Sequence, residues 1–129
     1  MRARTRRGIR VGGVAALVAS LALGAEKNTR GVELPISCGA ATQETFDRGL
    51  FLLHNMMYSQ ARGVFEDAAK AEGGCAMLQW GVAMTWFWPL WSGQPTKEAL
   101  AAGAAAVAKA RSLAASEHEK AYVAAVAGY

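Results

Sequence analysis

Residues 46–77 read FDRGLFLLHNMMYSQARGVFEDAAKAEGGCAM, and the spacing of their apolar side chains decides the fold class. Two apolar stripes recur at intervals of three and four residues, which is the repeat of one helix face. The stripes contain Phe46, Leu50, Leu53 and Met57, then Ala61, Val64, Phe65 and Ala68. Residues 55–59 separate the two stripes. Thr42 is the predicted N-cap of the first helix. After the second helix, Gly73 and Gly74 can adopt the positive φ of a helix terminus. This stretch therefore predicts two antiparallel helices joined by a short turn.

Three further helices are predicted downstream. A third apolar stripe follows Cys75 and ends at Pro89, which cannot continue a helix. Thr96 is the predicted N-cap of a fourth helix, and the run Ser116–Glu119, S-x-x-E, predicts a capping box that opens a fifth. The expected apolar faces are Met77, Trp80, Gly81, Met84 and Trp88; Leu100, Ala104, Val107 and Ala114; and Tyr122, Val123 and Val126. Five helices without a strand pattern predict an all-α fold of tandem antiparallel helical hairpins.

The first 41 residues precede this helical region, which we place at 42–129. Residues 1–25 combine five arginines with an apolar run and no acidic residue, which is typical of a secretory signal peptide. The expected location is therefore periplasmic or secreted, and the alternative is a chain anchored to the membrane by an uncleaved leader. Residues 26–41 show no helical period and predict an extended lead-in. No transmembrane span is expected in the mature chain, because Pro89 interrupts the tryptophan-rich stretch.

The charge distribution argues against nucleic acid as a partner. The chain has 14 basic and 10 acidic residues, but five of the basic residues lie in the leader. Residues 26–129 are therefore close to neutral, whereas a domain that binds nucleic acid carries a basic face on its folded part. The two cysteines, Cys38 and Cys75, both lie beyond the leader, where an oxidising compartment permits a disulfide. Two separately buried thiols are the alternative.

The helical region resembles a tetratricopeptide repeat (TPR), which places small residues, aromatics and alanines at fixed positions over two helices. The matching residues are Gly49, Tyr58, Ala61, Phe65 and Ala68, with Trp80 and Gly81 in the next unit. Residues 37–129 are similar to the beginning of secreted bacterial TPR proteins. The resemblance implies a TPR-like α-solenoid of about two and a half repeats, incomplete at its C-terminus. It also implies a binding scaffold for a protein or peptide, without catalytic residues of its own.

Catalytic motifs are absent from the sequence: it contains no G-x-S-x-G, H-E-x-x-H, P-loop or glycine-rich nucleotide fingerprint. We therefore expect neither an enzyme nor a cofactor. The tryptophans beside Pro89, which are Trp86, Trp88 and Trp91, form a candidate surface for a ligand or partner, and packing of a long turn is the other interpretation.

A small-molecule, haem or metal-binding domain is the second functional hypothesis. It would use the Trp86–Trp91 cluster and His54, which has Met56 and Met57 nearby. No second histidine, cysteine or acidic residue lies three or four residues away from His54, which favours a histidine that only packs within its helix, so no metal site is assigned. The apolar face of the last helix lacks a partner. It predicts either self-association or an N-terminal portion of a longer protein that continues beyond Tyr129.

Overall fold

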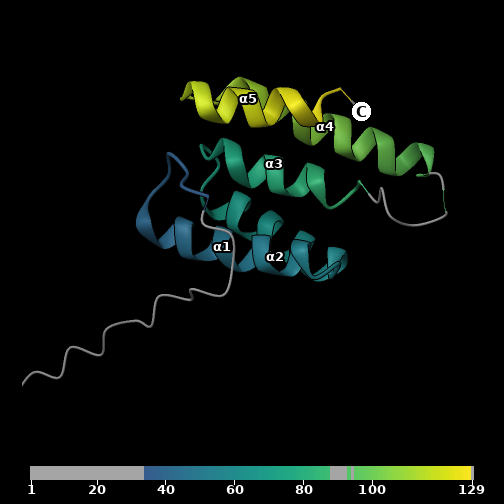
Figure 1. Cartoon of the computed structure of the whole chain (residues 1–129), viewed down its shortest axis with the longest axis horizontal. Helices are drawn as coiled ribbons and strands as arrows, with labels where there is room; N and C mark the ends of the chain where they lie inside the picture. The colour runs from purple at the N-terminus through teal and green to yellow at the C-terminus, as the bar shows by residue number, and fades with distance from the viewer. Residues whose placement is uncertain (1–33, 88–92, 94, 129) are drawn as a thin grey trace, which may run out of the picture.

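The computed structural model describes residues 34–87, 93 and 95–128 (Figure 1). Its elements are α1 (Ala40–His54), α2 (Tyr58–Ala71), α3 (Ala76–Met84), α4 (Lys97–Leu113) and α5 (Glu117–Val126). In this part of the chain all regular secondary structure is helical and there is no strand, which confirms the all-α prediction. The expected signal peptide, the lead-in up to residue 33, Trp88, Pro89 and Trp91 lie outside the described residues. None of the described helices is long and apolar enough to cross a membrane.

The helix starts test the predicted caps. The hydroxyl oxygens of Thr96 and Ser116 accept hydrogen bonds from the N–H groups of Ala99 and Glu119, at 3.1 and 3.2 Å, as the sequence predicts. The prediction for Thr42 is wrong. α1 begins at Ala40, three residues before the start that an N-cap at Thr42 implies, so Thr42 lies inside the first turn, where its hydroxyl donates to the Glu72 carboxylate. The turn after α2 is present, but neither glycine in it has a positive φ.

Contacts between helix ends set the directions of the helices. Cys38 lies just before α1 and is joined to Cys75, just after α2, so these two helices run antiparallel. Arg62, early in α2, donates hydrogen bonds to Thr85, which follows α3, so α2 and α3 are also antiparallel. α4 packs along α3, and α5 packs against both of them. Figure 1 shows α3 in the middle of the stack, with α1 and α2 on one side and α4 and α5 on the other.

The core is built around α3. Every residue from Ala76 to Ala83 is buried, so this helix is covered on all sides. The Phe65 ring of α2 lies between the backbones of α1 and α3. A Cβ atom built at Gly49 would lie 2.5 Å from this ring, and one built at Gly81 would lie 2.6 Å from it. These glycines therefore allow three helices to meet at one aromatic side chain.

Two expected apolar faces differ from the structure. In α4 the buried residues are Ala99, Ala106, Val107 and Ala110, whereas Leu100 and Ala104 are exposed. In an alanine-rich helix most faces are apolar, so periodicity cannot choose among them, and the alanine face allows the closer approach to α3. Met57 is exposed because it precedes α2 instead of continuing α1. Of the remaining repeat residues, Ala61 is fully buried, and Tyr58 and Ala68 pack partly buried against the core.

Candidate functional site

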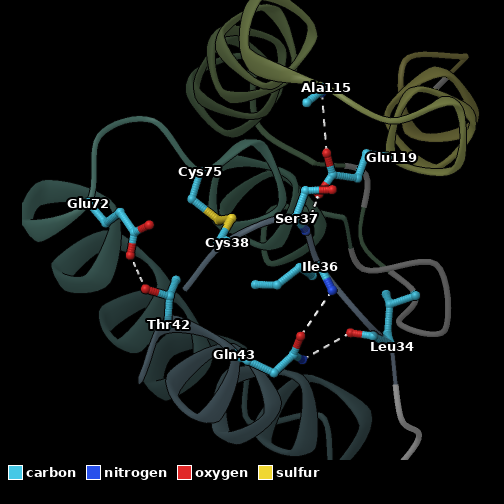
Figure 2. Close-up of a disulfide and its surroundings, with 10 residues drawn as sticks. All are labelled: Leu34, Ile36, Ser37, Cys38, Thr42, Gln43, Glu72, Cys75, Ala115 and Glu119. Carbon is cyan, nitrogen blue, oxygen red and sulfur yellow. Dashed lines mark hydrogen bonds between the residues drawn. A yellow bond between two sulfur atoms is a disulfide. The ribbon is translucent and has the colours of Figure 1, made fainter. Parts of the chain in front are cut away.

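Residues 34–38, which we call the lead-in segment, lie against the ends of the helices (Figure 2). Leu34 is only 7% exposed and belongs to the hydrophobic core, and Ile36 packs partly buried against the same core. Pro35 and Ser37 between and after them are exposed. This alternation of inward and outward side chains is characteristic of an extended chain with one buried face. The lead-in segment is therefore part of the fold.

Gln43, in the first turns of α1, binds the backbone of the lead-in segment. Its Oε1 atom accepts a hydrogen bond from the N–H of Ile36 at 2.9 Å, and its Nε2 atom donates to the carbonyl oxygen of Leu34 at 3.0 Å. Nε2 also donates to Oδ1 of Asp47, one helical turn further on, at 2.8 Å. Because the carboxylate of Asp47 can only accept when ionised, it orients the amide of Gln43 toward the segment.

Glu119 of α5 binds the same segment from the opposite side (Figure 2). Its Oε1 atom accepts from the N–H of Ser37 at 2.8 Å, and Oε2 accepts from the N–H of Ala115 at 3.3 Å. Only 3% of Glu119 is exposed. Burial raises the pKa of its carboxyl, but hydrogen bonds from the backbone N–H groups of Ser37, Ala115 and Ser116 outweigh this effect and leave the pKa below its ordinary value. Glu119 is therefore ionised at neutral pH.

Aromatic side chains of α1, α3 and α5 pack against one another between the helices that carry these two polar residues. Phe46 lies one turn beyond Gln43, and Tyr122 lies one turn beyond Glu119. The ring of Trp80 lies between them, with centroid distances of 6.2 Å to Phe46 and 5.7 Å to Tyr122. Among the described residues the buried indole N–H of Trp80 finds no hydrogen-bond acceptor. We call the site formed by Gln43, Phe46, Trp80, Glu119 and Tyr122 the lead-in slot.

A disulfide between Cys38 and Cys75 closes one end of the lead-in slot. The S–S distance is 2.06 Å and the two Cα atoms lie 5.9 Å apart. The sequence left the pairing of these cysteines open, and in the structure they are bonded. Cys38 directly follows the residues that occupy the slot, so the bond fixes this end of the segment to the start of α3.

Trp86 is the one member of the expected tryptophan cluster that the structure describes. The guanidinium of Arg62 lies over its ring, with Cζ 3.2 Å from the centroid. Trp86 also lines an apolar groove of about 710 Å³ between α4 and the ends of α3 and α5. Leu100, 51% exposed, and Val126 contribute to the same groove. Trp86 thus combines packing with a position at an apolar surface.

His54 shows no ligand arrangement. It is exposed near the end of α1, and its Nδ1 atom lies 2.9 Å from the carbonyl oxygen of Leu50 in the same helix. Met56 and Met57 are exposed in the following turn. Over residues 34–87, 93 and 95–128, no group of three or more His, Cys, Asp and Glu side chains is placed to hold a metal ion.

Sequence reasoning missed the lead-in slot almost entirely. The sequence alone assigns no role to Gln43, assigns Glu119 only a local role in a capping box, and places Leu34 and Ile36 in an extended lead-in without a contact to the helices. Their alternation in residues 34–37 was the one available signal, and it is too short to be distinctive. No protein-family model, no curated protein and no solved structure matches this chain, so the functional proposal rests on the geometry of the slot.

Proposed function

We propose that this chain is a non-catalytic scaffold of the exported bacterial TPR type, and that its lead-in slot binds extended polypeptide. The observation that carries the proposal is the pair of hydrogen bonds between the Gln43 side chain and the backbone of Leu34 and Ile36. Hydrogen bonds to backbone groups give affinity for any extended chain, while pockets for alternate side chains give specificity. The two hairpins, α1–α2 and α3–α4, together with α5, supply the frame of about two and a half TPR-like repeats.

An exported location is part of this proposal. The disulfide between Cys38 and Cys75 supports it, because stable disulfides form in oxidising compartments such as the periplasm or the cell exterior. Residues 1–25 would serve as the signal peptide. The partner is a protein or peptide, and the near neutrality of residues 26–129 argues against nucleic acid.

Panning of a displayed random-peptide library tests the proposal. The library is applied to the native chain and to a Leu34→Asp variant, in which the slot is opened by an unfavourable buried charge. We expect peptides with aliphatic residues at alternate positions and a Kd of about 1–100 μM. Gln43→Leu should weaken their binding about tenfold, because two backbone hydrogen bonds are lost, whereas Gln60→Leu on the exposed side of α2 should not. Failure to select any peptide with either protein form contradicts the proposal.

The haem or metal hypothesis has a separate test. Copper(II) or haemin at about 10 μM would quench tryptophan fluorescence if bound next to the tryptophan-rich turn. We expect no quenching, because His54 contacts only the backbone of its own helix and the described residues offer no cluster of ligands. Quenching that His54→Ala abolishes would favour the second hypothesis over the scaffold.

Self-association through the C-terminal helix also belongs to the proposal. The groove beside α5 supports it, because exposed apolar patches usually mark interaction surfaces. Sedimentation velocity from about 1 to 100 μM should show a sedimentation coefficient that rises with concentration. Leu100→Glu should abolish the rise, and Phe51→Glu, at an exposed position of α1, should leave it unchanged. A monomer at every concentration would remove self-association from the proposal.

A further inference from the structure

We propose that residues 34–37 are a resident ligand, which fills the lead-in slot in cis and competes with external peptides of the same chemistry. This inference rests on the proposed function and adds two things to it: the class of peptide that the slot accepts and the device that keeps the slot filled. The external ligand is an extended segment with aliphatic residues at two alternate positions, of the form Leu-x-Ile.

The contacts of the resident segment define what an external peptide must offer. Leu34 and Ile36 are the two side chains that pack against the core. The carbonyl oxygen of residue 34 and the N–H groups of residues 36 and 37 are the backbone groups that the slot binds. Residue 35 is a proline, which has no N–H, and the slot forms no hydrogen bond with the backbone at this position.

Proline at this position favours binding. It has a fixed φ, and it biases the preceding residue toward the extended region, so the segment loses less conformational freedom when it binds. The ring of Pro35 is exposed, so a proline at this position does not displace any contact within the slot. An external peptide should therefore tolerate proline at the central position and require free N–H groups at the two positions that follow it.

The tether explains why the slot is occupied by this segment. The chain connects the segment to α1, and the disulfide of Cys38 connects it to the start of α3. A ligand on a short tether has an effective concentration in the millimolar range. An external peptide present at about 10 μM would then be outcompeted roughly a hundredfold at equal intrinsic affinity.

Fluorescence anisotropy with a labelled peptide of sequence GVELPIS, that of residues 31–37, tests the inference. The Leu34→Asp variant should bind this peptide at least tenfold more tightly than the native chain. Adding Gln43→Leu should abolish the gain, and adding Gln60→Leu should leave it intact. N-methylation of the isoleucine nitrogen in the peptide should prevent binding, because Gln43 loses its donor, whereas N-methylation of the leucine nitrogen, which no hydrogen bond of the slot uses, should have no effect.

A second variant leaves Leu34 unchanged, and circular dichroism checks that both variants are folded before binding is measured. In Cys38→Ser/Cys75→Ser the segment keeps its sequence and loses one of its two tethers, so this variant should also bind the peptide more tightly than the native chain. Equal binding of the peptide by all three proteins would overturn the inference. The scaffold proposal would survive that result if peptides selected from the library still bind, and it would fail only if they do not.

Discussion

Gln43 and Glu119 direct their hydrogen-bonding groups at backbone and not at solvent. Each forms hydrogen bonds with backbone groups of the lead-in segment. Without them, these groups would lack a hydrogen-bond partner once Leu34 is buried. The carboxylate of Glu119 is nearly inaccessible, and a buried charge is tolerated only when several donors surround it. The N–H groups of Ser37 and Ala115 are such donors, so Glu119 couples α5 to the other end of the chain.

The dependence of stability on pH tests this role of Glu119. Its folded-state pKa lies below the ordinary value of 4.5, so ionised Glu119 stabilises the fold above that pH, and this contribution is lost as the pH falls through the folded-state pKa. The native chain should lose stability from about pH 5 downward more steeply than Glu119→Gln, which has no charge to neutralise. At pH 7 the variant should be about 1–2 kcal/mol less stable, measured by urea denaturation.

Glu117→Gln is the control for this measurement, because Glu117 lies two positions away and forms an exposed ion pair with Lys120. It should retain most of the native pH profile, since exposed pairs contribute little. Superimposable profiles of the native chain and Glu119→Gln would show that the carboxylate does not stabilise the fold.

Local sequence rules could not assign these two residues. The hydrogen bond between Ser37 and Glu119 spans 82 positions, whereas a capping rule considers only residues within one helical turn. The S-x-x-E pattern correctly predicts that Ser116 is the cap and that the Glu119 carboxylate accepts from the Ser116 N–H, but it contains no information about the distant donor Ser37. Thr42 is not a cap because α1 begins at Ala40, and its hydroxyl instead donates to Glu72, 30 positions away in the sequence.

Among the helices, the contact of α1, α2 and α3 depends on two glycines, Gly49 and Gly81, which have no side chain. Phe65 is completely buried, and its ring occupies the space that Cβ atoms at Gly49 and Gly81 would require. A helical glycine is intrinsically less favourable than alanine by about 1 kcal/mol. The close approach of the Phe65 ring therefore has to outweigh this intrinsic preference.

Alanine substitutions separate the two effects. Gly81→Ala should lower the free energy of unfolding by about 1–2 kcal/mol, because overpacking against Phe65 exceeds the gain in helix propensity. Gly63→Ala is the matched control within α2, where a Cβ meets nothing within 4 Å, and it should stabilise the protein by about 0.5–1 kcal/mol. Thermal denaturation of both variants gives the comparison. A neutral or stabilising Gly81→Ala would mean that the helices can separate without cost.

Arg62 of α2 fixes the C-terminal end of α3. Its Nη2 atom donates to the carbonyl oxygen of Thr85 at 3.0 Å, its Nε atom donates to the Thr85 hydroxyl at 3.1 Å, and its guanidinium lies over Trp86. Only a planar guanidinium can form both hydrogen bonds while it stacks on an aromatic ring. α3 has nine residues and needs such support, because isolated helices of this length are unstable in water.

Replacement by lysine tests this geometry while it preserves the charge. Arg62→Lys should destabilise the protein by about 1–2 kcal/mol in urea denaturation, and should shift tryptophan emission as Trp86 loses its partner. Arg48→Lys, at an exposed position of α1, should change the stability by less than about 0.5 kcal/mol. Equal effects of the two substitutions would contradict the stacking and hydrogen-bonding role.

The existence of the five helices was predictable because each carries its own signals, such as the cap at Thr96 and the glycine pair after α2. The orientation of α4 was not, because alanine covers nearly every face of that helix and the pattern favoured Leu100, which is exposed. Which side of a helix is buried then depends on how closely its neighbour can approach, and local periodicity contains no such information.

Across the whole molecule, the lead-in segment joins parts that otherwise do not meet. Among the described residues, no Cα atom of α1 lies within 8 Å of a Cα atom of α5, and α3 lies between the two helices. The segment bonds to Gln43 on α1, to Glu119 on α5 and, through Cys38, to the start of α3. It therefore connects the first, middle and last helices on one side of the bundle, so loosening it should affect the entire fold.

Removal of the disulfide tests this connection. Cys38 and Cys75 are 37 positions apart, and a cross-link that closes a loop of this size stabilises a protein by about 3–4 kcal/mol. Cys38→Ser/Cys75→Ser should show a correspondingly lower midpoint in urea, and the native chain should match it when a dithiol reductant is added. Hydrogen exchange should also accelerate at the amides of Ile36 and Ser37, because their segment has lost one tether. The reductant should have no effect on the double variant, which controls for nonspecific effects. If the stability falls while these two amides keep their native protection, then Gln43 and Glu119 hold the segment without help from the disulfide, and the slot is closed by hydrogen bonding alone.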